Sequence, residues 1–133
     1  MNVGDAFVPI SDVVNEHLWI IITKPDENGM VAMVNVTTKR AFVDESCILQ
    51  VGDHPYVQHE SVIAYQRART AKLMELETFS AKKVLKSRPA VGPDLLARIQ
   101  SGALASIYTP RGIKVAVRSE LGIMTQPESE GRP

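Results

Sequence analysis

Two apolar segments separated by a strong turn signal constrain the fold of this chain more than any other feature. Residues 18–23 form a continuous apolar run rich in β-branched side chains, which is typical of a buried central strand. Residues 24–29 contain the pair Asn28-Gly29, which readily adopts the positive φ angles of a tight turn. Residues 30–38 then supply a second strand. The sequence therefore predicts a β-hairpin.

The remaining pattern predicts further short strands and two helices. A first, edge-like strand is expected at 3–10, where Pro9 cannot donate to a ladder. Three more segments have strand patterns: 47–51, 62–69 and 113–117.

Helical composition begins at residue 70. Residues 70–87 are rich in helix formers, and Thr78 or Ser80 could cap a helix that holds Val84 and Leu85 and that Arg88-Pro89 would stop. A second helix is expected to begin at Pro93, with Gly102 as its stop signal. Short strands followed by late helices predict a mainly β fold with appended helices, of the α+β class, built as a small curled sheet or barrel.

Length and composition indicate one globular domain. The chain has 133 residues, of which 44% are hydrophobic, and we expect a single domain over 1–124 and a flexible tail over 125–133. The longest apolar run, 18–22, is too short to span a membrane, and the first residues lack a signal-peptide pattern. A lone Cys47 cannot form an intrachain disulfide, so a cytoplasmic location is expected.

Charge is divided unevenly along the chain. Residues 1–66 hold three lysines and arginines against nine acidic residues, a net charge of −6. Residues 67–133 hold twelve against six, a net charge of +6, with Arg67 and Arg69 near the start of the basic stretch. Such asymmetry indicates a surface for an anionic partner, or a solvated helix face that balances the acidic half.

Histidines provide the candidate chemistry. His54 and His59 lie in a polar segment that also holds Tyr56, and His17 precedes the first strand of the hairpin. Histidine is the side chain that titrates near neutral pH without perturbation, so these residues are candidates for proton transfer. The alternatives are that His54 satisfies turn backbone, that His59 is merely exposed, and that His17 bonds to backbone.

A metal site has little support in the sequence. His54 and His59 lie five residues apart with Asp53 and Glu60 beside them, whereas zinc sites show tighter spacings or cysteine pairs. We expect no metal and no cofactor.

Gly4-Asp5 opens the first expected strand, and Thr37-Thr38 ends the second strand of the hairpin. These residues resemble the start of the first strand and the Thr/Ser pair of the MazF/PemK family of toxins, within the CcdB/Kid superfamily. Residues 61–69 resemble a later strand with its serine, glutamine and basic end, and residues 94–99 resemble the C-terminal helix. One departure is that the family commonly has Arg-Pro where this chain has His17-Leu18 or Leu18-Trp19.

The resemblance implies an SH3-like small barrel with a C-terminal helix that forms a homodimer. It implies metal-independent cleavage of single-stranded RNA and control by a small antitoxin protein. Cleavage needs a base, an acid and donors to the phosphorane, and the candidates are His54, His59, His17 and Thr37. The candidate RNA-binding residues are Arg67, Arg69, Tyr56 and Tyr65. The alternative is a non-catalytic interaction module of the same fold that binds a protein partner, as gyrase poisons do.

Overall fold

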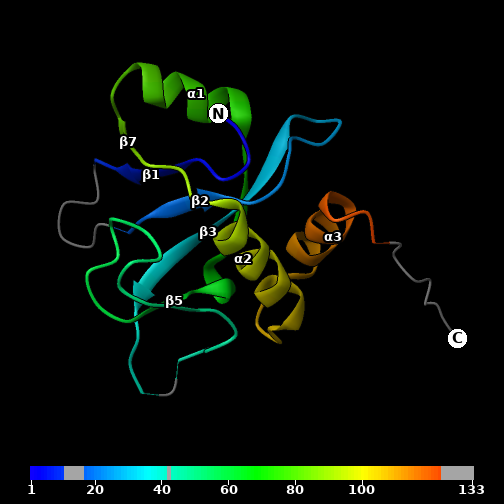
Figure 1. Ribbon diagram of the computed structural model, residues 1–133. Coiled ribbons are helices and arrows are strands. Elements are labelled where there is room, and N and C mark those ends of the chain that lie inside the picture. Colours follow the sequence, from blue (N-terminus) through cyan, green and yellow to red (C-terminus); the bar gives the residue numbers. More distant parts are fainter. Residues whose placement is uncertain (11–16, 42, 124–133) are drawn as a thin grey trace, which may run out of the picture.

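The hairpin expected from the sequence lies at the centre of a seven-stranded antiparallel sheet (Figure 1). A computed structural model describes residues 1–10, 17–41 and 43–123. Strand β2 (Trp19–Ile21) pairs with the long strand β3 (Met30–Thr38). In the turn between them, Asp26 Oδ1 accepts two backbone N–H groups and Gly29 adopts a φ of +75°. The hairpin prediction is therefore confirmed.

The strands follow the order β4-β5-β3-β2-β1-β7, with β6 also paired to β3. No pairing among the described strands joins β4 to β7, so the sheet is open in that part of the chain. The fold is thus a mixed α+β arrangement of one antiparallel sheet and three α-helices. The remaining strands are β1 (Ala6–Pro9), β4 (Ile48–Leu49), β5 (Ser61–Ile63), β6 (Arg69–Lys72) and β7 (Leu85–Arg88).

Strand β3 pairs with two successive strands along one edge. Its C-terminal half pairs with β5 and its N-terminal half pairs with β6, while β2 occupies the opposite edge. A 3₁₀ helix, η1 (Tyr65–Arg67), separates β5 from β6. The single strand expected at 62–69 is therefore interrupted by one tight turn, with Arg67 exposed at its end and Arg69 exposed at the start of β6.

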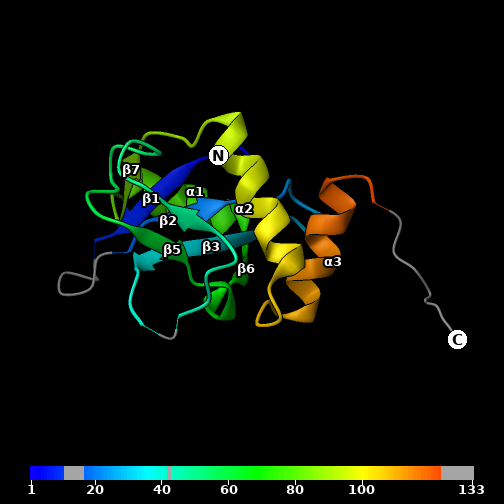
Figure 2. The ribbon, with the colours of Figure 1, turned by 60° about the horizontal axis from the view of Figure 1, so that its bottom comes forward.

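Successive side chains of each strand point to opposite faces of the sheet, and each face has its own apolar core. One face, including Val34 and Val36, packs against α2 (Pro93–Ala105) and α3 (Arg111–Glu120). The other face, including Met33 and Trp19, packs against α1 (Leu73–Ala81). Figure 2 shows α2 and α3 side by side at one end of the sheet. Residues two apart in a strand point the same way, so β3 contributes to both cores.

The prediction of a last strand at 113–117 is wrong, because these residues lie in helix α3. Ile113 and Val117 are buried one helical turn apart, whereas Val115 is 45% exposed. Ile113 and Val117 are apolar because positions i and i+4 share the buried face of a helix, and Val115 lies on the exposed face.

Three further expectations need correction. Helix α1 ends at Ala81, and Lys83 has a φ of 61°, so Leu85 begins β7 instead of continuing the helix. Strand β1 is not an edge, because β7 pairs with it on the side away from β2. Gly102 does not end α2, which continues to Ala105. The expected tail, 125–133, lies outside the described residues.

The helices of the described residues are too short to cross a bilayer, since the longest, α2, has 13 residues.

Candidate functional site

Two neighbouring pockets lie where β2 and β3 meet the loops, and His17 lines both. The histidine pocket has a volume of about 250 Å³, and its polar lining includes His17, Thr37, Thr38, Arg40, Tyr56 and His59. The arginine pocket has a volume of about 520 Å³ and is lined by Pro9, His17, Trp19, Asn35, Arg67 and Arg69. The shared histidine places the two pockets next to each other, and we treat them together as the candidate site.

Strand alternation places the polar part of this site. Asn35 and Thr37 are two apart in β3 and so lie on the same face as Met33. Met33 belongs to the apolar core beneath α1, whereas Asn35 and Thr37 line the pockets. The same face of β3 is therefore apolar at one end and polar at the other. Trp19 pairs with Asn35 across β2 and β3 and forms the boundary between the two parts.

His17 has a fixed tautomer. Its Nδ1 lies 3.1 Å from the carbonyl oxygen of Val36, and a carbonyl only accepts, so Nδ1 carries the proton. In the neutral ring, Nε2 is then the basic nitrogen. The side chain is half-buried and lines both pockets, so the Val36 carbonyl holds the ring, through Nδ1, at the junction between them.

His59 reaches the same pocket from the loop before β5. Its Nε2 lies 2.9 Å from Thr38 Oγ1, and a hydroxyl can donate or accept. The contact therefore suits either protonation state of the ring. His17 and His59 thus line one pocket with Thr37 between them in sequence, although they come from separate segments.

The arginines of the site are not neutralised within the described part of the chain. Arg40, Arg67 and Arg69 are exposed, and no salt bridge joins them to a described carboxylate. The Arg69 guanidinium lies over the Trp19 ring, 4.8 Å from its centroid, which holds it in place by a cation–π contact. Nearby Lys39 contrasts with them, because Glu45 and then Glu60 raise its pKa.

Two of the candidate residues lie elsewhere. His54 is 3% exposed; its Nε2 donates to the Pro89 carbonyl at 2.6 Å, and its Nδ1 accepts the Tyr56 backbone N–H at 3.0 Å. Both ring nitrogens are therefore engaged: Nε2 joins the loop to residue 89, and Nδ1 bonds within the loop itself. Tyr65 is fully buried, and its hydroxyl donates to the Ile99 carbonyl at 2.6 Å. We therefore leave both residues out of the site proposed below.

Other residues of the site were not anticipated. Asn35 and Trp19 line the arginine pocket, and Thr38 and Arg40 line the histidine pocket. The sequence signal for Asn35 was an amide within an otherwise apolar strand, which strand propensity disfavours. Arg40 lies two residues after the strand ends, and only the folded structure shows that it lines the same pocket as His59.

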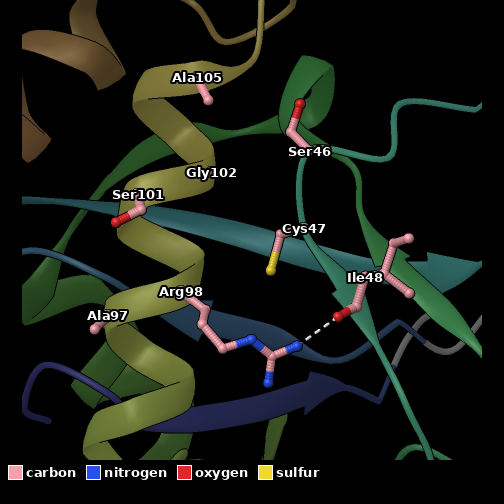
Figure 3. Close-up of a pocket in the computed structure, with 8 residues that line it drawn as sticks. All are labelled: Ser46, Cys47, Ile48, Ala97, Arg98, Ser101, Gly102 and Ala105. Atoms are coloured by element: carbon pink, nitrogen blue, oxygen red, sulfur yellow. Dashed lines mark hydrogen bonds between the residues drawn. The ribbon is translucent and has the colours of Figure 1, made fainter.

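A separate hollow of about 420 Å³ lies between β4 and α2 (Figure 3). Figure 3 shows Cys47 between the strand and the helix, with Arg98 donating to the Ile48 carbonyl. Burial raises the pKa of the Cys47 thiol, which keeps it protonated and a weak nucleophile. Arg98 is also paired with Asp53 at 3.1 Å, so this hollow offers little free chemistry.

Within residues 1–10, 17–41 and 43–123, no three His, Cys, Asp or Glu side chains are grouped so that they could hold a metal ion. Neither a scan against protein-family models nor a search of curated proteins found a match for the chain.

Proposed function

We propose that this chain is a MazF/PemK-like protein that cleaves single-stranded RNA without a metal ion. The observation that carries the proposal is the pair of pockets that share His17, with His59 and Thr37 lining one and two arginines, which have no salt bridge to a described carboxylate, lining the other. These residues span positions 17 to 69 of the sequence, yet they line one surface. A base, an acid and phosphate donors are the groups that such cleavage requires.

The reaction would proceed by attack of a ribose 2′-oxygen on the adjacent phosphorus. One histidine removes the 2′-hydroxyl proton as the O2′–P bond forms, and the other protonates the 5′-oxygen as the P–O5′ bond breaks. His17 suits the base, because its Nδ1 is fixed on Val36 and its Nε2 is left to accept. His59 suits the acid, because its contact with Thr38 tolerates a charged ring. Thr37, Arg67 and Arg69 would hold the phosphate oxygens.

Several features of the fold support the family assignment within this proposal. The Thr37-Thr38 pair ends β3, as the resemblance implies, and the two strands of the segment from Ser61 to Lys72, β5 and β6, both pair with β3. We infer an SH3-like small barrel because one long strand, β3, pairs with three other strands, β2, β5 and β6. In the absence of the family's Arg-Pro, Arg67 and Arg69 would supply the missing cation. The proposal includes a homodimer and a small antitoxin as partners.

A second candidate is a non-catalytic module of the same fold that binds a protein. The observation in its favour is the loop between α2 and α3, where Ile107 is 83% exposed and Tyr108 is 57% exposed. Apolar side chains exposed to this degree are common at protein-binding surfaces. RNA cleavage discriminates between the two candidates.

The test is incubation of the purified protein with a long single-stranded RNA in the presence of a chelator. Wild type should give discrete cuts that leave 2′,3′-cyclic phosphate ends. The variants His17→Ala and His59→Ala should each lower the rate by about 10²–10⁴-fold, as expected when a positioned acid or base is lost.

Gln58→Ala is the matched control, because Gln58 lines the histidine pocket but cannot titrate. Cutting should persist in this variant. Intact RNA with wild type, or equal cutting by all four proteins, would reject the enzyme and favour the interaction module.

A further inference from the structure

The loop between β4 and β5 forms one side of the histidine pocket. Four consecutive residues of this loop line the pocket, namely Tyr56, Val57, Gln58 and His59. The loop then runs into β5, where Ser61 pairs with Thr38 of β3. Nearer its start, Asp53 pairs with Arg98 at the surface, where an ion pair contributes little. The position of His59 therefore depends on what holds the residues between these two points.

The buried side chain of His54 makes that contact. It is 3% exposed and does not line the pocket. Its Nε2 donates to the Pro89 carbonyl at 2.6 Å, and its Nδ1 accepts the Tyr56 backbone N–H at 3.0 Å. The His54 carbonyl in turn accepts the Val57 N–H at 2.9 Å. Of these three bonds, only the one to Pro89 leaves the loop, and we call it the Pro89 anchor.

The Pro89 anchor joins the two ends of the open sheet. The loop follows β4, at one end of the strand order, whereas Pro89 follows β7, at the other end. The neighbouring Arg88 makes a second contact between the same two segments, since its guanidinium lies 5.4 Å from the centroid of the Tyr56 ring. The loop that carries His59 is thus attached to the far edge of the sheet.

We propose that His54 is a positioning residue for His59: through the Pro89 anchor it sets the loop so that His59 lies at Thr38, in place to act as the acid. An acid must lie within hydrogen-bond reach of the oxygen that it protonates, and a misplacement of about 1 Å can cost about 10²-fold in rate. His54 itself does not line the pocket, so it contributes only through the loop. This inference rests on the proposed function.

The test is steady-state cleavage of single-stranded RNA in the presence of a chelator. His54→Ala should lower kcat by about 10–100-fold and change KM by less than about threefold, because Arg67 and Arg69 still bind the RNA. In the double variant His54→Ala/His59→Ala, kcat should equal that of His59→Ala. A residue that acts only through His59 contributes nothing once His59 is removed.

Two conservative variants test the Pro89 anchor itself. The side-chain nitrogen of His54→Gln lies the same number of bonds from Cα as Nε2, so it can still donate to Pro89. The side-chain oxygen of His54→Asn takes the place of Nδ1 and can accept only the bond within the loop. His54→Gln should therefore recover kcat to within about fivefold of wild type, and His54→Asn should resemble His54→Ala.

Gln100→Ala is the matched control for a purely structural role. Gln100 is also buried, and its Nε2 donates to the Ile22 carbonyl at 2.9 Å. Neither of these residues lines either pocket. Urea denaturation should show a loss of stability in both Gln100→Ala and His54→Ala, whereas kcat should fall only in His54→Ala. The kinetics are measured at a temperature at which circular dichroism shows each variant to be folded.

Each kinetic outcome decides the inference. A kcat of His54→Ala within about twofold of wild type, a further fall in the double variant, or an equal fall in Gln100→Ala would overturn it. A kcat of His54→Gln no higher than that of His54→Asn would overturn it as well. If His54→Ala does not fold, the comparison of His54→Gln with His54→Asn carries the same test.

Backbone amide exchange decides the anchor if wild type does not cut RNA, a result that would reject the proposed function. Exchange of the Val57 and His59 amides at least about tenfold faster in His54→Asn than in wild type and His54→Gln would support the anchor. Equal exchange in all three proteins would overturn it.

Discussion

At the scale of single residues, Tyr65 shows how a side chain with ligand chemistry becomes part of the core. Its hydroxyl donates to the Ile99 carbonyl within α2, and burial raises its pKa far above the ordinary value. The contact depends on Gly102, because a Cβ at that position would clash with the Tyr65 hydroxyl and lie 3.0 Å from the Cys47 Cβ. The glycine therefore allows α2 to approach the sheet closely.

This close approach leads to the first prediction, for Gly102→Ala. The added methyl group would displace Tyr65 and weaken its bond to Ile99, because it would overlap the Tyr65 hydroxyl and crowd Cys47. We expect the free energy of unfolding to fall by about 1–3 kcal/mol, the usual cost of overpacking, as measured by urea denaturation.

Gly112→Ala is the matched control for that prediction. Gly112 lies in α3, and a Cβ there would meet nothing within 4 Å. Alanine is a better helix former than glycine, so this variant should be unchanged or more stable by up to about 1 kcal/mol. Equal destabilisation of both variants would contradict the packing argument.

The sequence could indicate histidine chemistry but could not choose among the histidines. His54 and His59 have similar polar surroundings in the sequence, whereas the carbonyl that engages His54 belongs to Pro89, 35 residues away. His59 meets Thr38 across 21 residues. Only the fold decides which ring is enclosed and which lines a pocket, because both contacts are long-range.

At the scale of elements, α3 shows that apolar alternation alone does not identify a strand. A strand over these residues would place Ile113, Val115 and Val117 on one face. The helix instead buries Ile113 and Val117 and leaves Val115 exposed. Helix α3 begins directly after Pro110. At its other end, Glu120 Oε1 accepts the Lys24 backbone N–H, which holds the helix against the β2–β3 turn.

The second prediction distinguishes the helix from the strand. Ile113→Ala should lower the free energy of unfolding by about 2–5 kcal/mol, because it leaves a cavity in the core. Val115→Ala should change it by less than about 0.5 kcal/mol, because the side chain is exposed and alanine favours helix. Both values come from urea denaturation. Comparable losses in the two variants would favour a strand.

The third prediction concerns the connection between α2 and the loop after β4. The Gln50 backbone N–H, and after it the Arg98 side chain, hold the pKa of Asp53 below its ordinary value of 3.8. A lowered folded-state pKa stabilises the protein above pH 3.8, and that contribution is lost as the pH falls through the folded pKa.

Asp53→Asn should therefore be less stable than wild type at about pH 7 by no more than about 1 kcal/mol, since the pair is partly exposed. The difference should shrink at about pH 3, in urea denaturation at each pH. Glu27→Gln, at an exposed turn position, is the control and should follow wild type at both values. A difference that is constant with pH would rule out the carboxylate as its origin.

Local signals specified the central hairpin but not the elements that depend on distant partners. Asn28-Gly29 and the flanking apolar runs act within a few residues, and β2 and β3 formed as expected. Strand β7 instead depends on β1, nearly 80 residues before it, and its sequence is helix-compatible. The pairing with β1 overrides a weak local preference, which is why Leu85 belongs to a strand.

At the scale of the whole molecule, the fold brings together arginines from the acidic and the basic halves of the chain. Arg40 belongs to the acidic first half of the chain, whereas Arg67 and Arg69 begin the basic half. Pairing of β3 with β5 and β6 brings these segments together around the two pockets. A chain with zero formal net charge thereby presents a local group of three unpaired cations within its described residues.

The fourth prediction follows from this charge distribution and concerns the salt dependence of RNA binding. Each phosphate contact to single-stranded RNA contributes about 0.7 to the slope of log affinity against log salt. Replacement of Arg40, Arg67 and Arg69 together by alanine should reduce that slope by about 2 between about 50 and 200 mM salt. The matched control replaces Arg111, Lys114 and Arg118 of α3, which packs on the other face of the sheet, and it should keep the wild-type slope. Equal slopes for the two triple variants would mean that RNA does not select the pocket face, and the charge argument would fail with it.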